Sequence, residues 1–413
     1  MNYIIKAPTT GLQATISLPA SKSISNRVLI LNVLSPHPQE IHNLSDCDDT
    51  EVMLRALRSE APDINIKAAG TAMRFLTAYL AGKSGQWTLT GTERMKNRPV
   101  KILTEALIAL GARIECIEKE GFPPLRITGN RLKGGEISLD GSVSSQYISA
   151  LLMVAPQMMN GLQLHLTNEL ISKPYLQLTI RLMKLFGVTV FENEQTYTIP
   201  PQQYTAIPFT VEPDWSAASY WYAMVALSER AEVALPGLLP DSLQGDAAIV
   251  PLFGKLGVET TFTSLGVTLK RKERLSCERV VIDFTDMPDM AQTLTVTCAM
   301  LGIPFCFGGL QSLRIKETDR LAALRTELRK FGYLLTERDG RILEWNGERC
   351  NAEASPVIAT YEDHRMAMAF ALMSMREPEG IRMADVEVVS KSYPHFWEDL
   401  RLAGFQCTTG HEK

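Results

Sequence analysis

The 413-residue sequence lacks long apolar runs and has little excess charge of either sign. The apolar run of most interest, residues 147–156, is far shorter than the about 20 residues that a membrane-spanning helix requires. The first residues lack the cationic region and apolar core of a signal peptide. The net charge of −4 gives no support to a nucleic-acid partner, since nucleic-acid-binding domains are usually basic. We therefore expect a cytoplasmic protein without a membrane span.

Cysteines and histidines at metal-ligand spacing are also missing. The sequence has seven cysteines and six histidines, and no two cysteines form a C-x-x-C pair. An odd and scattered set of cysteines is typical of reduced thiols in a cytoplasm. We expect neither a disulfide frame nor a structural metal. The cysteines stand at positions 47, 116, 277, 298, 306, 350 and 407.

The length of the chain indicates two domains, because 413 residues exceed what a single typical core accommodates. A repeated sequence pattern supports this division: a predicted amphipathic helix ends in a glycine, and a β-rich segment follows. The glycines recur at intervals of 70 to 76 residues. A glycine at a helix end adopts the left-handed conformation without Cβ strain. These glycines are Gly111, Gly187, Gly257, Gly332 and Gly404.

Six strongly apolar helices are predicted in step with this repeat. They begin near residues 21, 71, 145, 216, 289 and 363, at intervals of 50, 74, 71, 73 and 74. Since helices that are apolar on most faces are buried, the strands should lie outside them. The sequence thus predicts six α/β units in two sets of three. The first unit is shorter by about 20 residues, and we place the loss between about Leu57 and Ala68.

The segment Arg314–Leu321, R-I-K-E-T-D-R-L, concentrates five charged residues before an apolar run with helical spacing. We predict a helix start here, capped by Thr318 or Asp319. On such a helix, Lys316 and Arg320 would share one face, with Glu317 about 100° away from Lys316. A solvated, salt-bridged helix start is the simpler alternative.

Several cations stand at predicted helix starts, where free N–H groups favour an anion. Capping residues, surface loops and solvated helix ends are the alternative for each one taken alone. In a chain of net negative charge, their sum favours a small polyanionic substrate, because guanidinium forks suit carboxylates and phosphates. Sequence spacing does not show whether they converge. These cations are Lys22, Arg27, Arg94, Lys316, Arg320, Arg365 and Lys391.

Acidic residues also stand at predicted helix starts. Asp214, Asp289 and Asp363 could each be an ordinary N-cap. Asp289 and Glu317 are the best acid/base candidates, because each lies beside a segment rich in cations or polar groups. Arg365 lies on an otherwise apolar helix, where a buried guanidinium needs an anionic partner.

Seven motifs occur in the order found in one protein family. They are L-P-A-S-K-S-I-S-N-R, G-T-A-M-R, R-M-K-N-R-P, D-G-S-V-S-S-Q, S-K-P-Y, R-I-K-E-T-D-R-L and Y-E-D-H-R-M-A-M. Together they make the chain resemble the EPSP synthase (3-phosphoshikimate 1-carboxyvinyltransferase) family from Leu18 to about Trp397. The resemblance implies an α/β fold, a two-domain inside-out α/β barrel. Each domain would contain three βαβαββ-type units with buried helices and outer sheets, the first unit being shortened. Residues 1–20 would join residues 213–413 in one domain, and residues 21–212 would form the other.

The resemblance implies transfer of the enolpyruvyl group of phosphoenolpyruvate to the 5-hydroxyl of shikimate 3-phosphate, through a tetrahedral intermediate. The expected protein is a monomer that binds these two small substrates without metal or organic cofactor and closes its domains around them. The residues implied for phosphoenolpyruvate are Lys22, Arg94, Arg320, Arg365 and Lys391. Those implied for shikimate 3-phosphate are Lys22, Ser23, Arg27, Ser144, Ser145, Gln146, Ser172, Tyr175, Asp289, Ser312 and Lys316. Those implied for proton transfer are Lys22, Asp289 and Glu317.

Three positions depart from the family pattern. Ala68 and Ser312 stand where the family usually has asparagine, and Phe75 stands where it usually has proline. Ser312 keeps a hydroxyl able to bond a substrate, whereas Ala68 removes an amide. Gly70 and Phe75 lie where the family's sensitivity to glyphosate is set, and Gly70 favours sensitivity.

Two alternatives stand beside this interpretation. The related enolpyruvyl transferase that acts on UDP-N-acetylglucosamine typically carries a reactive cysteine on a mobile loop, and residues 94–99 contain none here. The other alternative is a catalytically impaired relative that binds shikimate 3-phosphate, disabled by the short first unit and Ala68. The presence of both proton carriers, Asp289 and Glu317, argues against it.

Overall fold

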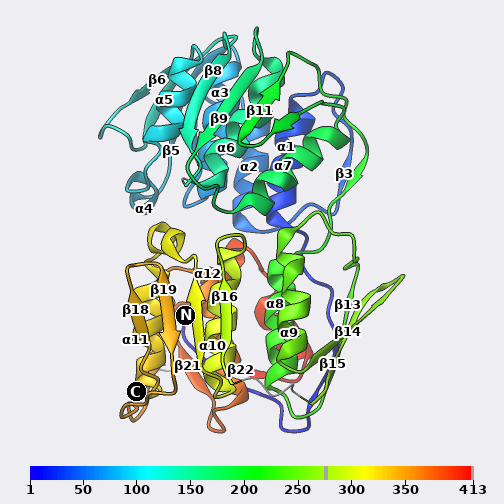
Figure 1. The fold of residues 1–413 in the computed structure, drawn as a ribbon, viewed down its shortest axis with the longest axis vertical. Coiled ribbons are helices and arrows are strands. Elements are labelled where there is room, and N and C mark those ends of the chain that lie inside the picture. The colour runs from blue at the N-terminus through cyan, green and yellow to red at the C-terminus, as the bar shows by residue number, and fades with distance from the viewer. Residues whose placement is uncertain (143, 274–277, 411–413) are drawn as a thin grey trace. The chain divides into compact units, whose positions relative to one another are not determined.

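The computed structural model describes residues 1–142, 144–273 and 278–410. The chain forms two compact units (Figure 1). Unit 1 combines Met1–Pro19 with Glu212–Lys413, and unit 2 is Ala20–Val211. Each boundary lies one residue before the one expected from the sequence. No helix in these residues is long and apolar enough to cross a membrane.

Unit 2 is built from helices and short strands in alternation. Its helices are α1 (Lys22–Val33), α2 (Asp48–Arg58), α3 (Gly70–Gly82), α4 (Glu93–Lys96), α5 (Lys101–Ala109), α6 (Ser145–Val154) and α7 (Lys173–Leu185). Its strands are β3 (Ile41–His42), β4 (Asp63–Asn65), β5 (Gly85–Thr90), β6 (Arg113–Cys116), β7 (Leu125–Gly129), β8 (Gly135–Asp140), β9 (Leu162–Thr167), β10 (Phe191–Asn193), β11 (Thr196–Ile199) and β12 (Phe209–Thr210). They form two four-stranded sheets, ordered β4-β5-β7-β6 and β10-β11-β9-β8, and a two-stranded parallel sheet, β12-β3.

Unit 1 repeats this pattern with three four-stranded sheets, ordered β14-β15-β13-β2, β16-β17-β19-β18 and β20-β21-β1-β22. Its helices are α8 (Trp215–Leu227), α9 (Ile249–Lys255), α10 (Ala291–Met300), α11 (Arg320–Lys330), α12 (His364–Ala371) and α13 (Phe396–Leu402). Its strands are β1 (Tyr3–Lys6), β2 (Leu12–Thr15), β13 (Ala231–Pro236), β14 (Val258–Thr263), β15 (Gly266–Arg271), β16 (Val280–Asp283), β17 (Phe305–Gly308), β18 (Thr336–Arg338), β19 (Ile342–Trp345), β20 (Val357–Ile358), β21 (Ile381–Met383) and β22 (Gln406–Thr409).

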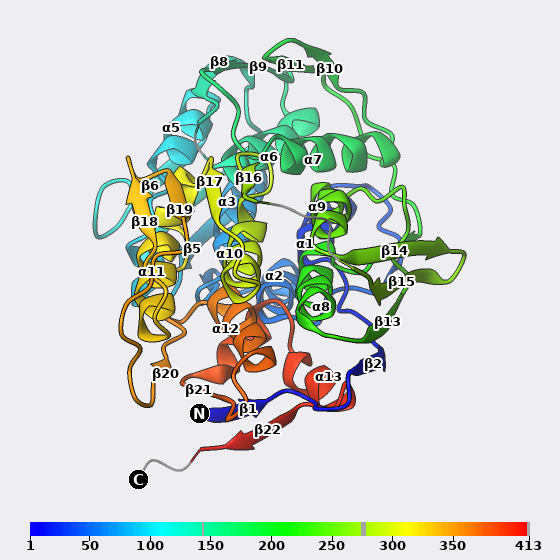
Figure 2. The same cartoon turned by 60° about the horizontal axis from the view of Figure 1, so that its bottom comes forward.

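The first two strands of the chain complete sheets made by its second half. β1 lies between β21 and β22 and is antiparallel to both, as Figure 2 shows for β1 and β22. β2 pairs in parallel with β13. The N-terminal residues therefore belong structurally with residues that follow position 212.

The most apolar helices lie inside their units. Every residue of α8 and of α10 is buried, and α3 is buried over almost its whole length. These helices have no polar stripe to turn toward water, so the surrounding elements must cover all their faces. The strands alternate instead: on β5, Trp87 and Leu89 are buried while Gln86 is exposed, which is the pattern of a sheet with one covered face.

The first repeat is incomplete, as its length predicts. In unit 2, α5 leads into the strand pair β6 and β7, and α7 leads into β10 and β11. α2 instead leads directly into β4, with no strand between Arg58 and Asp63. The corresponding sheet therefore consists of β3 and β12 alone. The expected loss between Leu57 and Ala68 includes this junction.

The repeated glycines occupy the position after a helix end, where we predicted them. Each follows the C-cap residue of its helix and has a positive φ, between 81° and 101°. In that region an L side chain is strained and glycine is not. α2 ends without such a glycine, since Ser59 is its C-cap and has an extended conformation. The six described cysteines form no disulfide with one another, and Cys277 lies outside the described residues.

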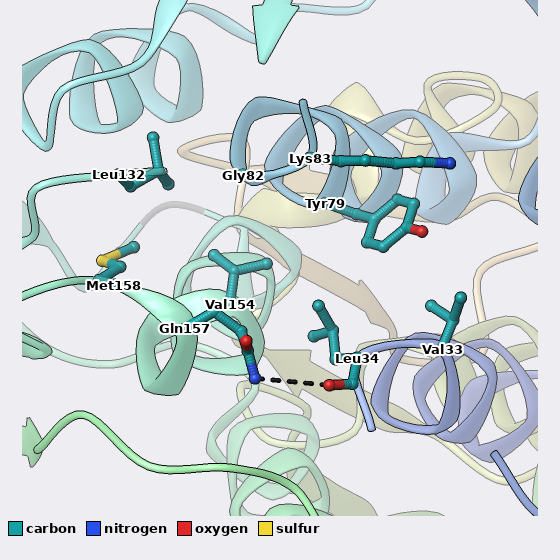
Figure 3. Close-up of a pocket in the computed structure, with 9 residues that line it drawn as sticks. All are labelled: Val33, Leu34, Tyr79, Gly82, Lys83, Leu132, Val154, Gln157 and Met158. Carbon is teal, nitrogen blue, oxygen red and sulfur yellow. Dashed lines mark hydrogen bonds between the residues drawn. The ribbon is translucent and has the colours of Figure 1, made fainter. Parts of the chain in front are cut away.

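A small pocket opens at the C-terminal ends of α1, α3 and α6 (Figure 3). Apolar side chains line most of it, together with the polar groups of Tyr79, Lys83 and Gln157. The amide of Gln157 donates to the Leu34 carbonyl oxygen at 3.4 Å. The predicted substrate residues of these helices stand at their opposite ends.

Two glycines of unit 1 should respond oppositely to a methyl group. Gly332 has a φ of +84°, and an added Cβ would lie 2.9 Å from the Cys350 carbonyl oxygen. Gly332→Ala should therefore lower the free energy of unfolding by roughly 1–2 kcal/mol. Gly254 lies inside α9 with no atom within 4 Å of an added Cβ, so Gly254→Ala should raise it by about 0.5–1 kcal/mol. Urea unfolding of both variants measures this, and shifts of the same sign would contradict the assignment.

Candidate functional site

The guanidinium of Arg320 is surrounded by three carboxylates. Its side chain is 1% exposed. Nε donates to Asp363 Oδ2 at 2.7 Å, and Nη2 donates to Asp363 Oδ1 at 3.2 Å and to Glu317 Oε2 at 2.9 Å. Nη1 donates to Asp289 Oδ1 at 2.9 Å. The two-bond contact with Asp363 is the fork geometry that favours arginine over lysine.

This cluster joins the starts of three helices of unit 1. Arg320 is the first residue of α11, and Asp363 is the N-cap of α12, where its side chain accepts a bond from the Arg365 amide. Asp289 lies in the 3-10 turn Pro288–Met290, directly before α10. The ion pairs therefore fix the N-terminal ends of α10, α11 and α12 against one another. Helix N-termini favour anions, which adds to the attraction of the cations here.

Three further cations complete the cluster. Lys316 Nζ lies 3.7 Å from Asp289 Oδ1, Arg365 Nη2 lies 3.2 Å from Asp289 Oδ2, and Lys391 Nζ lies 3.2 Å from Glu317 Oε1. Four cations thus face three carboxylates, which gives a formal charge of +1. An anion would be attracted to this site. We call these seven residues the Arg320 cluster: the cations Lys316, Arg320, Arg365 and Lys391 and the carboxylates Asp289, Glu317 and Asp363.

The charges perturb one another strongly. Burial alone would raise the pKa of Asp289, but Arg365, Lys316 and Arg320 outweigh it and hold that pKa well below its usual range. Burial lowers the pKa of Lys316, and Asp289 partly opposes this. Asp289 is therefore an ionised carboxylate at neutral pH.

Unit 2 contains a buried cation with a different environment. Arg27 is 3% exposed, and its Nε donates to Thr179 Oγ1 at 2.7 Å and its Nη1 to the Ser23 carbonyl oxygen at 2.9 Å. The guanidinium lies 5.4 Å from the Phe75 ring centroid. No carboxylate forms an ion pair with it among the residues that the structure describes. Burial lowers the pKa of Arg27 to about 10. A buried cation with neutral partners favours binding of an anion.

The other predicted residues of unit 2 lie mainly at helix starts. Lys22 is the first residue of α1, and its Nζ lies 3.3 Å from Asp49 Oδ2. Gln146, near the start of α6, donates from its amide to Thr71 Oγ1 at 3.2 Å. The remaining predicted residues are Ser23 in α1, Arg94 in α4, Ser144 and Ser145 at the start of α6, and Ser172 and Tyr175 at the start of α7.

Ser312 of unit 1 has an unusual environment. It lies in the 3-10 helix Gln311–Ile315. Its Oγ is buried and has no hydrogen-bond partner within the described ranges. A buried hydroxyl without a partner is disfavoured, so a ligand that supplied one would be stabilised there.

Two expectations about local geometry are wrong. Lys316 and Arg320 do not share a helical face, because α11 begins only at Arg320 and Lys316 has a non-helical ψ of −146°. The charged segment bends before the helix, and this bend directs Lys316 toward Asp289. Asp289 is also not an N-cap, since Met290 has that position in α10. Its carboxylate pairs with Lys316, Arg320 and Arg365. The expected capping by Asp319, Asp214 and Asp363 is confirmed.

Sequence analysis missed the protein's own partners for these cations. Asp363 was interpreted as a cap, yet it also holds Arg320, and Asp49 pairs with Lys22. Thr179 accepts from Arg27, and it lies in none of the sequence motifs. The available signal was the rule that a buried cation needs a buried acceptor, but the rule does not say which of many distant residues supplies it.

The residues that line the pocket of Figure 3 include none of the residues that we predicted to bind a substrate. α1 rises about 1.5 Å per residue, so its Lys22 end and its Val33 end are more than a dozen ångströms apart, roughly the length of the helix. The candidate site therefore consists of the helix starts, and the pocket is a separate feature of unit 2.

Comparisons with known proteins agree on one family. The sequence profile of EPSP synthase (3-phosphoshikimate 1-carboxyvinyltransferase) matches residues 6–59 and 59–400. The chain is 55% identical over 413 residues to a 3-phosphoshikimate 1-carboxyvinyltransferase of Bacteroides fragilis, covering 100% of both chains. It is 36% identical over 429 residues to one of Sulfurovum sp., covering 97% of this chain and 99% of that one. A solved EPSP synthase structure from Acinetobacter baumannii is similar in fold, with a TM-score of 0.78 at 21% identity over 99% of this chain and 100% of that one.

Asp246 is a buried carboxyl beside the Arg320 cluster. Ser216 Oγ donates to its Oδ2 at 2.5 Å, and Arg365 Nη2 donates to the same Ser216 Oγ at 3.5 Å. Burial raises the pKa of Asp246 to about 6, although the Ser216 bond acts in the opposite direction. This pKa lies above the ordinary value of 3.8. Between these values the folded protein holds a proton that the unfolded chain has lost, so stability falls as the pH rises through that window.

Asp246→Asn should therefore raise the free energy of unfolding by roughly 2 kcal/mol at pH 7 and by little at pH 4. The amide cannot ionise, so it avoids the penalty of a buried charge. Urea unfolding at several pH values measures the difference. The exposed Asp241→Asn is the control, and it should show no such pH dependence. A difference for Asp246→Asn that stays constant from pH 4 to pH 7 would contradict the assignment.

Proposed function

The chain belongs to the EPSP synthase family, and from this we propose that it transfers the enolpyruvyl group of phosphoenolpyruvate to the 5-hydroxyl of shikimate 3-phosphate, with release of phosphate. The observation that carries the proposal is the Arg320 cluster. It combines fixed cations for an anionic substrate with two carboxylates, Asp289 and Glu317, that are placed to exchange protons. The reaction requires both.

The proposed architecture is that of two inside-out α/β barrels, each with three βαβαββ-type units. The buried helices and the four-stranded sheets support it. Each four-stranded sheet has one parallel pair and two antiparallel pairs, for example β16-β17 and then β17-β19 and β19-β18. Because one βαβαββ repeat recurs along the chain, helix starts with polar residues recur at the same place in each repeat.

We assign phosphoenolpyruvate to the cations Arg320, Arg365 and Lys391 of unit 1, together with Lys22 and Arg94. Guanidinium forks suit its carboxylate and phosphate groups. Lys391 and Arg365 are each less than one-eighth exposed, so an anion that bound there would be little screened by water. Their partners in the free protein, Glu317 and Asp289, would exchange part of these contacts for the ligand.

We assign shikimate 3-phosphate chiefly to the residues of unit 2. Arg27 supports this, because the partners of its buried charge within residues 1–142, 144–273 and 278–410 are all neutral. Asp289, Ser312 and Lys316 complete the set from unit 1, and the unpartnered hydroxyl of Ser312 is a candidate donor to the substrate. The remaining residues assigned to this substrate are Lys22, Ser23, Ser144, Ser145, Gln146, Ser172 and Tyr175.

The reaction proceeds by addition and elimination. In the addition, one proton goes to the methylene carbon of phosphoenolpyruvate, which becomes a methyl group, while the 5-hydroxyl oxygen attacks the adjacent carbon and gives its own proton to a base. In the elimination, the tetrahedral intermediate loses phosphate and one proton of that methyl group, which re-forms the carbon–carbon double bond. Glu317 and Asp289, assisted by Lys22, exchange the protons. The intermediate keeps its anionic groups, so cations that are already in place stabilise it without reorganisation.

The catalytically impaired alternative has little support. A relative named 3-phosphoshikimate 1-carboxyvinyltransferase aligns with this chain over 413 residues and the whole of both chains. Its length therefore leaves no room for the missing strand pair either. We infer that an enzyme of this family can work although the first α/β repeat, which lies in unit 2, is short.

Phosphate release by the purified protein tests the function. Release should require phosphoenolpyruvate and shikimate 3-phosphate together, and UDP-N-acetylglucosamine should not replace the latter. Glu317→Gln should lower kcat by about 10²–10⁴-fold, which is the contribution of a positioned proton carrier. Glu259→Gln is the control, since Glu259 lies on β14 and pairs with Lys272 outside the cluster. Binding of shikimate 3-phosphate without any release would favour the impaired relative.

The role of Arg27 predicts a substrate-specific defect. Thr179→Val keeps the side-chain shape but removes the hydroxyl that accepts from Arg27 Nε. The KM for shikimate 3-phosphate should rise about tenfold, and the KM for phosphoenolpyruvate should stay unchanged. Thr104→Val is the matched control, because Thr104 is also buried and bonds helix carbonyls only. Equal changes in both KM values, measured by initial rates, would contradict the assignment.

A further inference from the structure

The buried carboxylate of α11, Glu327, is not used by the proposed reaction. Glu327 lies two helical turns after Arg320 and is 0% exposed. Its Oε1 accepts from the Tyr361 hydroxyl at 2.6 Å. Its Oε2 accepts from the Ala359 amide at 3.1 Å and from Lys330 Nζ at 2.7 Å. Two of these three donors belong to the segment that precedes α12.

That segment has an unfavourable backbone. Tyr361 and Glu362 have φ values of +55° and +52°, so two consecutive residues that are not glycine adopt the left-handed conformation. Such residues persist only where the surrounding structure holds them. Glu327 of α11 accepts hydrogen bonds from Ala359 and Tyr361, and these bonds hold the segment against α11. The Asp363 amide, which donates to the Thr360 carbonyl oxygen at 2.9 Å, closes the turn.

The same segment ends at Asp363, the carboxylate that holds Arg320. α11 thus contacts residues 359–363 at two points: Glu327 binds the beginning and Arg320 binds the end. Asp363 also caps α12 through the Arg365 amide. A shift of the turn would move the acceptor of Arg320 and the start of the helix that carries Arg365 together.

We propose that Glu327 and Tyr361 are positioning residues that set the place of Asp363, and through it the orientation of Arg320 toward phosphoenolpyruvate. This inference rests on the proposed function. Glu327 suits the role because a carboxylate only accepts, and it is met by three donors. Burial raises the pKa of Tyr361 well above its usual value, and Glu327 adds to this, so the hydroxyl stays a donor.

Tyr361→Phe is the least disruptive test, because it removes one hydroxyl and leaves the ring. The KM for phosphoenolpyruvate should rise about fivefold, while the KM for shikimate 3-phosphate should change less than twofold. Glu327→Gln should give a similar defect, since its amide group would face a donor. The double variant should be no worse than the more affected single variant, because both act on one contact.

Tyr222→Phe is the matched control. Tyr222 is buried in the same unit, and its hydroxyl accepts from Thr260 Oγ1 at 3.2 Å, away from the turn. It should lower thermal stability without changing either KM. If Tyr361→Phe behaves like this control, the two residues serve stability only and the inference is wrong.

Hydrogen exchange gives a readout that does not need activity. Tyr361→Phe and Glu327→Gln should speed exchange of the amides of residues 359–366 at least tenfold over the wild type, and Tyr222→Phe should not. Wild-type protein without activity would refute the proposed function, and the exchange result would still decide whether Glu327 holds the turn. Unchanged exchange in both variants would overturn the inference even if the enzyme is active.

Discussion

The structure of unit 1 depends on the compensation of one buried guanidinium. Arg320 is almost fully removed from water, and an unpaired cation there would carry a large desolvation penalty. Asp289, Glu317 and Asp363 supply that compensation from separate stretches of the chain. Because each stretch leads into a helix or follows one, neutralising a single charge also brings the starts of α10, α11 and α12 together. Packing and electrostatics thus impose the same arrangement.

The two buried arginines illustrate two ways of using such a charge. Arg320 is neutralised by carboxylates, so it forms a fixed part of the site even without a ligand. Arg27 donates to the hydroxyls of Thr179 and Ser149 and to two backbone carbonyl oxygens, which orient it but leave its charge uncompensated. The first arrangement gives rigidity, and the second gives affinity for an anion. An enzyme that binds two anionic substrates can use both.

The sequence predicted features that depend on local chemistry. The buried α8 and α10 follow from segments without a polar face, and Gly332 follows from the left-handed residue that ends α11. It failed where distant residues decide the outcome. Lys316 lies before the helix, where the bend of the chain brings it to Asp289. The second role of Asp363 depends on a contact with Arg320, 43 positions earlier. The missing strand pair could be predicted because it changed a spacing. The partner of a particular cation leaves no such mark on the sequence.

The place of β1 in its sheet has a consequence for synthesis of the protein. β1 pairs on one side with β21 and on the other with β22, which ends at Thr409. A ribosome therefore has to make nearly the whole chain before the first strand finds both neighbours. The continuous segment Ala20–Val211 has no such dependence. Unit 2 can fold while unit 1 is still being translated. β2 can pair once β13 has been made, whereas β1 stays unpaired until β21 and β22 follow, almost four hundred residues later.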